Sequence, residues 1–254
     1  MRSTTYFLFF GLLLLSACVS EDINSGAEST KAGSYATMLT ISNYLYVVNK
    51  TQITTFDISI PDSPVELSKQ DVGFDVESLY HHAGLLLIGS ANNMYIYRIG
   101  TNGIPVRESA TEYNQAFGTE VCTSDPIVVK ENLAYVTLSS FTEVCRGFAR
   151  INQLRVYDIQ DFKDPKLLTT IDMTSPKGLG IGKTHLFVCD KVDGLVMYDL
   201  ENPVKPIKVK TISGFEGFDL IVNGNLLVVV AKDKLLQYDI SDEINIKYLS
   251  KIDL

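Results

Sequence analysis

An internal repeat with a period of about 40 residues constrains the fold of this chain more than any other feature of its sequence. An aromatic–Asp–aliphatic triplet recurs with its central residue at positions 57, 98, 158, 199 and 239, which are 41, 60, 41 and 40 residues apart. A proline follows the central residue by seven positions in four copies, at Pro64, Pro105, Pro165 and Pro206. Two spacings that persist through four copies indicate an array of equivalent structural units.

Each copy reads as four short β-strands. A short apolar run lies about a dozen residues before each triplet, and the segment that ends in the triplet alternates in polarity, as in Leu154-Arg155-Val156-Tyr157. Asp, Ser, Asn and Pro then favour a turn. Four strands in about 40 residues are typical of β-propeller blades. We therefore predict an all-β fold over residues 34–254: a five-bladed β-propeller of four-stranded antiparallel blades. An open array, or a larger ring that another chain completes, is the alternative.

Two stretches carry a resemblance to a known family. They are Ala134-Tyr135-Val136 with Val156-Tyr157-Asp158-Ile159, and Gly194–Leu200 with Pro206. These stretches resemble the LVIVD repeat, and the resemblance covers about residues 35–254, with departures at Arg98 and Ile246. It implies a cell-surface propeller protein from a family mostly without assigned chemistry.

The segment before the repeats has the features of an export signal. Arg2 supplies a positive charge, an apolar run follows, and Leu15-Ser16-Ala17-Cys18 resembles the lipobox of bacterial lipoproteins, which are cleaved before the cysteine and acylated on it. We expect a signal peptide at residues 1–17 and a flexible polar tether at residues 18–33 that begins at lipidated Cys18. An ordinary signal peptide with a chance cysteine is the alternative.

The residues after Cys18 and the net charge limit the location and the partners. Val19 stands where an inner-membrane lipoprotein often has Asp, and Ser20-Glu21-Asp22 resembles a short acidic signal for the outer face of Gram-negative cells. We expect a lipid-anchored protein of the bacterial outer membrane that is exposed at the cell surface, with the periplasmic face as the alternative. A formal net charge of -8 disfavours nucleic acid as a partner.

Two cysteines fall in the one elongated copy. Cys122 lies before the first apolar strand of that copy, and Cys145 lies between its second and third strands. In an up-and-down blade these two connections lie on the same face of the propeller, and an exported protein permits disulfides. We predict a Cys122–Cys145 disulfide, with a metal site as the weaker alternative. Cys189 lies within an apolar strand and is expected to be a buried thiol.

We infer a candidate site on the same face by counting residues back from the start of each predicted second strand. Side chains alternate along a strand, so residues an even number of positions apart point to the same side. Equal parity places four carboxylates near the start of the inner strands, with a lysine beside them: Asp75, Glu77, Asp125, Glu216 and Lys177. Carboxylate oxygens suit a hard cation, so this rim indicates a polar-ligand site or a Ca²⁺ site, without another cofactor. Paired carboxylates also suit glycoside hydrolysis. Simple solvation of acidic side chains is the third interpretation.

No catalytic motif stands out elsewhere in the sequence. We therefore expect a non-enzymatic, surface-tethered module that binds a protein, a peptide or a glycan through the face that carries the predicted disulfide. The main alternative is an exported, glycosidase-like hydrolase that uses the acidic rim. A scaffold that only displays loops to a neighbour is the third possibility.

Overall fold

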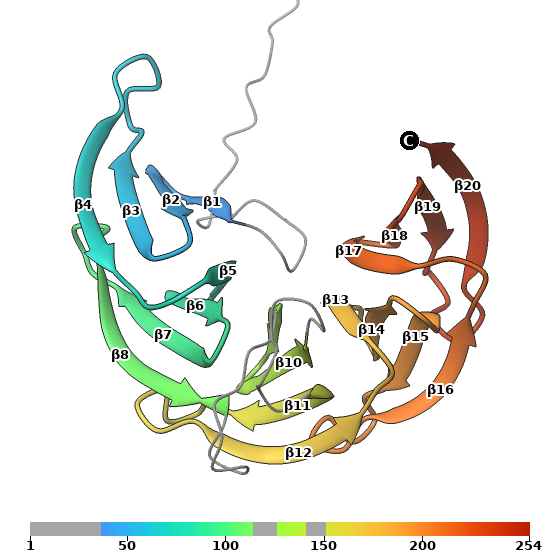
Figure 1. The fold of residues 1–254 in the computed structure, drawn as a ribbon. Coiled ribbons are helices and arrows are strands. Elements are labelled where there is room, and N and C mark those ends of the chain that lie inside the picture. The colour runs from blue at the N-terminus through green and yellow to red at the C-terminus, as the bar shows by residue number, and fades with distance from the viewer. Residues whose placement is uncertain (1–36, 114–125, 141–150) are drawn as a thin grey trace, which may run out of the picture.

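The computed structural model of the chain describes residues 37–113, 126–140 and 151–254. These residues form five four-stranded sheets, and each sheet is an antiparallel meander of four consecutive strands. No α-helix occurs in the described ranges. The sheets are arranged around a common centre, with the first strand of each sheet innermost (Figure 1). The predicted all-β fold, a propeller of five four-stranded blades, is confirmed.

The strand bounds define the blades. Blade 1 consists of β1 (Met38–Ile41), β2 (Tyr44–Val48), β3 (Gln52–Asp57) and β4 (Val65–Asp71). Blade 2 consists of β5 (Val76–His82), β6 (Leu85–Ser90), β7 (Asn93–Ile99) and β8 (Pro105–Glu112). Blade 3 consists of β9 (Ile127–Lys130), β10 (Leu133–Ser139), β11 (Asn152–Asp158) and β12 (Lys166–Asp172). Blade 4 consists of β13 (Pro176–Ile181), β14 (His185–Asp190), β15 (Gly194–Asp199) and β16 (Ile207–Ile212). Blade 5 consists of β17 (Gly217–Asn223), β18 (Leu226–Ala231), β19 (Lys234–Asp239) and β20 (Lys247–Asp253).

The repeated triplet ends the third strand of every blade and starts the turn to the fourth. The triplet aspartate accepts a hydrogen bond from the backbone N–H two residues later, at 2.8 Å for Asp57, 2.8 Å for Asp158, 2.7 Å for Asp199 and 2.8 Å for Asp239. The carboxylate thus closes an Asx-turn, as the residue types predicted. A β-bulge also precedes the triplet aromatic residue in all five blades, so the copies are equivalent in backbone geometry as well as in sequence.

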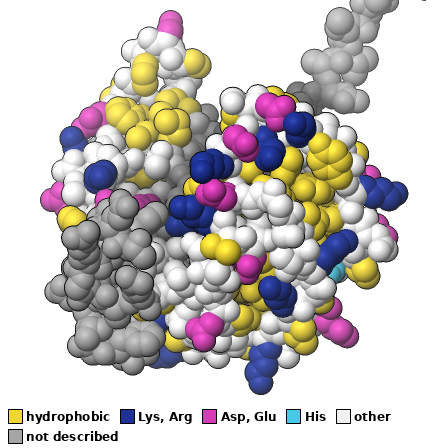
Figure 2. Space-filling view, turned by 45° about the vertical axis from the view of Figure 1, so that its right-hand side comes forward, with side chains coloured by type: hydrophobic (Ala, Val, Ile, Leu, Met, Phe, Trp, Pro, Cys, Tyr) yellow, Lys and Arg dark blue, Asp and Glu magenta, His cyan; other side chains and the backbone are white. Residues whose placement is uncertain are grey.

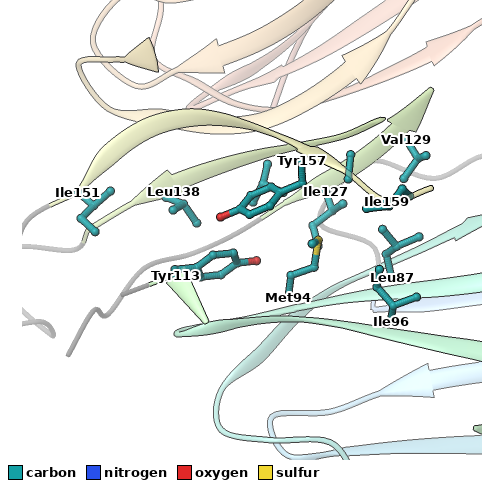
Figure 3. Packing of buried hydrophobic residues seen from close by; sticks show 12 residues of the cluster. Leu87, Met94, Ile96, Tyr113, Ile127, Val129, Leu138, Ile151, Tyr157 and Ile159 are labelled. Carbon is teal, nitrogen blue, oxygen red and sulfur yellow. The ribbon is translucent and has the colours of Figure 1, made fainter. Parts of the chain in front are cut away.

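The core of the described residues consists of four hydrophobic clusters, each of which lies between two consecutive blades. Figure 3 shows the cluster between blades 2 and 3, where Met94 of blade 2 faces Tyr157 of blade 3 and Leu87 of blade 2 faces Ile159. The triplet aromatic residue is buried in such a cluster in blades 2 to 5. Blade-to-blade packing, rather than a single central core, therefore holds the described structure together.

The ring is open between blade 5 and blade 1. No hydrophobic cluster of the described residues joins these two blades, although every consecutive pair shares one. Figure 1 shows the opening between blade 1, in blue, and blade 5, in red. The five predicted blades are complete, and the structure corresponds to the open-array alternative rather than to a closed circle.

The remaining sequence predictions concern the chain termini and the cysteines. Cys18, Cys122, Cys145 and Asp125 lie outside the described residues. Cys189 is a free, fully buried thiol, as predicted, and burial raises its pKa well above the ordinary value. Within the described ranges, no helix has the length and apolar character that a membrane span requires.

Candidate functional site: a central cavity of mixed charge

A cavity of about 950 Å³ opens at the centre of one face of the propeller. The segments that enter the inner strands line it, together with the hairpins between the second and third strands. Its lining residues are Thr37, Val48, Asn49, Lys50, Asp75, Val76, Glu77, Ser140, Asn152, Thr174, Ser175, Lys177, Lys191, Phe218 and Asp219. The predicted gathering of these two kinds of connection on one face is therefore observed.

Three of the predicted rim residues meet in the cavity: Asp75, Glu77 and Lys177 all line it. Glu216 does not line it. Its carboxylate instead lies 3.3 Å from Nζ of Lys232, and this ion pair is largely exposed. In blade 5 the cavity is lined instead by Phe218 and Asp219.

Three charged residues of the cavity were not predicted: Lys50, Lys191 and Asp219. A sequence signal existed for the lysines, because a lysine follows the second strand in three copies, at Lys50, Lys191 and Lys232. With three lysines beside its carboxylates, the rim has mixed charge rather than the predicted acidic character. Figure 2 shows basic and acidic side chains interspersed around the hollow in this view, with hydrophobic side chains on both sides of it.

Asp75 has an unusual backbone conformation at the cavity wall. Its φ is 51°, in the left-handed region that residues with a side chain seldom adopt. The other non-glycine residues with positive φ in the described ranges are in the hairpins between first and second strands: Ser42, Ala83 and Glu131. The backbone of Asp75 is held by a hydrogen bond from Ala91 N–H to its carbonyl oxygen, at 3.2 Å. Strained residues of this kind concentrate at functional sites.

Glu77 is a half-buried carboxyl group whose pKa is raised toward neutral pH. Burial, and then the charge of Asp75, raise the pKa of Glu77 to about 7, although the charges of Lys177 and Lys50 act in the opposite direction. Near neutral pH this side chain therefore exists in both forms. It can donate a hydrogen bond when protonated and accept one when ionised.

Lys177 is a buried amine at the floor of the same cavity. The residue is 6% exposed, and its Nζ donates a hydrogen bond to Oγ of Ser139 at 3.2 Å. Burial, and then the charge of Lys191, lower its pKa, whereas Glu77 and Asp190 favour the charged form. The Oγ1 of Thr137 donates to the carbonyl oxygen of Lys177 at 2.6 Å, which fixes the backbone that presents the amine.

The donor set of the cavity suits an organic molecule better than a metal ion. No group of three or more His, Cys, Asp or Glu side chains in the described part of the chain is placed to hold a metal. The ammonium groups of Lys50, Lys177 and Lys191 would repel a cation at the same place. Hydroxyl and amide groups add neutral donors and acceptors, at Asn49, Ser140, Asn152, Thr174 and Ser175.

No protein-family model matches the chain, and no curated protein matches it. The LVIVD resemblance is therefore not confirmed. Solved structures do match its fold. A computationally designed protein, Ika8, has a TM-score of 0.59 at 14% identity, over 85% of this chain and 60% of that one. A periplasmic gluconolactonase of Pseudomonas aeruginosa has a TM-score of 0.64 at 14% identity, over 84% of this chain and 68% of that one.

A functionally unknown protein of Desulfotomaculum acetoxidans is similar to the same degree, with a TM-score of 0.63 at 8% identity, over 90% of this chain and 70% of that one. The chain thus spans 60 to 70% of the length of these three structures. At such low identity the similarity shows the β-propeller fold alone, and function has to be argued from the site.

Proposed function

We propose that this protein is a binding module whose central cavity takes a polar organic ligand, of the size of a short glycan or peptide, that carries both hydrogen-bond donors and acceptors. The observation that supports this most is the presence of both Glu77 and Lys177 in the lining of one cavity of about 950 Å³, where each charge favours the charged form of the other. Ligand sites in proteins commonly have this size and combine apolar walls with a few placed polar groups.

The burial of these two groups argues against a merely solvated rim. Removing a charged group from water is costly, and that cost needs a compensating interaction. Lys177 is almost fully buried, whereas Glu216 and Lys232 form an exposed pair of the kind that a solvated rim would show throughout. The hydrogen bond to Ser139 and the charges of Glu77 and Asp190 supply such compensation for Lys177, and a bound ligand with complementary polar groups would add to it.

Exposed apolar side chains beside the cavity suit a ligand that extends beyond it. Phe74 directly precedes Asp75 in the chain and is 71% exposed, and Val192 directly follows Lys191 and is 65% exposed. Large exposed hydrophobic residues next to polar lining groups are a common feature of recognition surfaces. We therefore favour a peptide segment or a glycan over a small ion.

We also propose that the module is tethered through lipidated Cys18 at the outer face of the outer membrane, and that its repeats are of the LVIVD type. The lipobox-like Leu15–Cys18 and the acidic Ser20–Asp22 support the location. Labelling of cells with a palmitate analogue should modify the wild-type protein and not a Cys18→Ala variant. Protease added to intact cells should degrade the wild-type domain if it faces outward and should leave it intact if it faces the periplasm.

Hydrolysis is the second candidate function, and the pKa of Glu77 is the observation that favours it. A carboxyl group with a pKa of about 7 can act as a general acid near neutral pH. The name of the Pseudomonas neighbour, gluconolactonase, suggests glucono-1,5-lactone as a first substrate to test. Turnover of the lactone by the wild-type protein, and its loss in Glu77→Gln with folding intact, would favour this function over simple binding.

A glycan array, with D-gluconate and a tripeptide library as further probes, tests the binding proposal. We expect at least one probe to bind the wild-type protein and to bind Lys177→Met and Glu77→Gln more weakly. Glu216→Gln is the matched control, because it removes a carboxylate from the same region outside the cavity. Equal binding by all four proteins, or binding by none, would refute the assignment of the ligand to this cavity.

A further inference from the structure

The second strand of each blade presents an apolar position to the preceding blade. In blades 2 to 5 this position holds Leu86, Ala134, Leu186 and Leu227, all fully buried. Leu45 occupies the matching position of blade 1, because it pairs with Phe56 in the way that Leu86 pairs with Tyr97. Leu45 is only partly buried. The difference follows from the opening of the ring, which leaves blade 1 without a preceding blade.

Two further residues of blade 1 are also less buried than their counterparts in the other blades. Val47 matches four buried residues, Ile88, Val136, Val188 and Val229. Phe56 matches the four buried triplet aromatics, Tyr97, Tyr157, Tyr198 and Tyr238. Val47 and Phe56 themselves are partly exposed. Leu45, Val47 and Phe56 are called here the free face of blade 1.

Blade 5 has a corresponding surface on its other side. Val228 matches Tyr46, Leu87, Tyr135 and Phe187, which pack against the following blade and are fully buried. Leu235 matches Ile53, Met94, Leu154 and Leu195, which are also fully buried. Val228 and Leu235 are partly exposed, as are Leu226 and Val230 on the same side of the sheet. These four residues are called the free face of blade 5.

Both free faces retain the residue types of a blade-to-blade interface. Terminal repeats that face solvent usually carry polar residues on their outer side, because exposed apolar surface costs about 25 cal/mol per Å². The two surfaces also contain polar Thr54 and Gln237, which lie beside the seven apolar residues of the free faces. Apolar patches of this kind mark sites of protein interaction.

We propose that the opening between blade 5 and blade 1 is a docking site for one β-sheet blade of a partner protein, an antiparallel sheet with apolar side chains on both of its faces. One face of the incoming blade covers Leu226, Val228, Val230 and Leu235. Its other face covers Leu45, Val47 and Phe56. Each contact repeats the interface that already joins blades 1 to 5 four times within the chain.

Three segments of this sequence lie outside the described residues. Residues 114–125 and 141–150 are much shorter than blade 5, which occupies residues 217–253. Residues 1–36 are about as long as that blade, but within them residues 18–33 are rich in Ser, Glu, Asp, Asn and Gly and lack an alternating apolar pattern. Length and composition therefore disfavour these three segments as the source of the docking blade.

A second copy of this chain fits the opening poorly. Each of its end blades has only one free face, so one inserted blade would cover blade 1 or blade 5 but not both. Two copies could cover all four of their free faces only by forming one circle of ten blades. Such a circle would be much wider than the ring that the four intrachain interfaces form, and these interfaces fix the angle between neighbouring blades. An element with two apolar faces is therefore the better occupant.

The existing interfaces also indicate a polar group that the partner would carry. The hydroxyl of Tyr46 in blade 1 donates to the carbonyl oxygen of Gly103 in blade 2 at 2.7 Å. The hydroxyl of Tyr135 in blade 3 donates in the same way to Pro203 of blade 4 at 2.8 Å. The matching turn of blade 1, between β3 and β4, faces the opening. We expect the docking blade to carry a tyrosine in its second strand that donates to this turn.

Matched aspartate substitutions test whether the free face of blade 1 is uncovered in the isolated protein. In the isolated protein, Leu45→Asp should lower the Tm by no more than about 5 °C, because Leu45 is only partly buried and borders the opening. Leu86→Asp, at the same position of blade 2, should prevent folding. Equal damage by the two substitutions would show that the chain covers its own free face, and would overturn the proposal.

Sedimentation equilibrium tests whether a second copy occupies the opening. The isolated protein should be a monomer, and self-association that Leu45→Asp abolishes would identify a second copy as the occupant instead.

A chain with an added blade tests the capacity of the opening. The probe is the full chain extended at Leu254 by a second copy of residues 173–212, which contain blade 4, a sheet that is buried on both faces. We expect a higher Tm and stronger hydrogen-exchange protection of β2 and β18 than in the unextended chain. Leu45→Asp in the extended chain should cancel the gain. No gain in protection at either strand would contradict the proposal.

Discussion

Glu243 in the β19–β20 turn of blade 5 binds Thr184 in the β13–β14 turn of blade 4 through two hydrogen bonds. Its Oε2 accepts from the backbone N–H of Thr184 at 2.8 Å and from Thr184 Oγ1 at 2.9 Å. The N–H groups of Lys183 and His185 also donate to this carboxylate. The side chain of Glu243 is 5% exposed. One buried carboxylate thus ties the last blade to the rest of the array.

We predict that Glu243→Gln destabilises the protein by ~1–3 kcal/mol, because an amide cannot accept all of these hydrogen bonds and its NH₂ group faces donors. Urea unfolding at pH 7 measures the loss. Glu201→Gln is the control, since Glu201 lies exposed in the corresponding β15–β16 turn. An equal midpoint for Glu243→Gln and Glu201→Gln would contradict the role of this contact.

The same carboxylate makes stability depend on pH. Burial alone would raise the pKa of Glu243, but the hydrogen bonds from Thr184, Lys183 and His185 outweigh it and hold the pKa below the ordinary value. A depressed pKa in the folded state stabilises the protein above the unfolded-state pKa, and this contribution is lost as the pH falls through the folded-state value. We therefore expect the difference in stability between wild type and Glu243→Gln to shrink in acid. A difference that grows below pH 4 would refute this.

Glu77 should have the opposite effect on stability. Its pKa of about 7 in the folded state lies above the ordinary value of 4.5, so the folded protein holds this proton more tightly than the unfolded chain does. Stability from this group is therefore present below about pH 4.5 and declines as the pH rises toward 7. Chemical unfolding across this range should show a decline for wild type that is absent in Glu77→Gln. A decline of the same size in both proteins would assign it to other groups.

The tyrosine hydroxyls between blades should contribute measurably to stability. Tyr46→Phe removes the hydrogen bond to Gly103 and leaves a buried carbonyl oxygen without this donor. We expect a loss of ~1 kcal/mol in the free energy of unfolding. Tyr248→Phe is the control, because Tyr248 is 56% exposed. Thermal unfolding of both variants, with no loss specific to Tyr46→Phe, would show that the carbonyl finds another partner.

The predicted Cys122–Cys145 disulfide can be tested independently of the fold. In the folded, non-reduced protein with lipidated Cys18 we expect no labelling by iodoacetamide, because the acyl group blocks Cys18, Cys189 is buried, and Cys122 and Cys145 are joined. Denaturant without reductant should expose Cys189 alone, and reductant should then expose two more thiols. Mass spectrometry counts the labels, and labelling of three thiols before reduction would disprove the disulfide.

Particular residues show how far the sequence determines the fold. The Asp57, Asp158, Asp199 and Asp239 turns and the buried triplet aromatics repeat with fixed spacing, so the blades and their strand order were predictable. The opening between blade 5 and blade 1 was not predictable in this way. Leu45 and Phe56 have the same residue character as their buried counterparts, and burial depends on a neighbour that the local sequence does not specify.

The candidate site was predictable only in part for a similar reason. In blade 4 the pairing of His185 with Asp199 spans one residue more than that of Leu85 with Arg98. His185, rather than the first apolar residue Leu186, is therefore the counterpart of Leu85, so a count back from the apolar run falls one residue away from Ser175 and Lys177, which line the cavity. Lys50 and Lys191 belong to hairpins, where alternation gives no direction for a side chain.

Calorimetric titration at pH 7 of the best probe from the glycan and peptide screen, into wild type and Lys177→Met, tests the binding function most directly. If the buried ammonium group of Lys177 contacts the ligand, the variant should bind at least about tenfold more weakly, since a charged hydrogen bond contributes about 1.5–3 kcal/mol. Equal dissociation constants for two folded proteins would contradict the account.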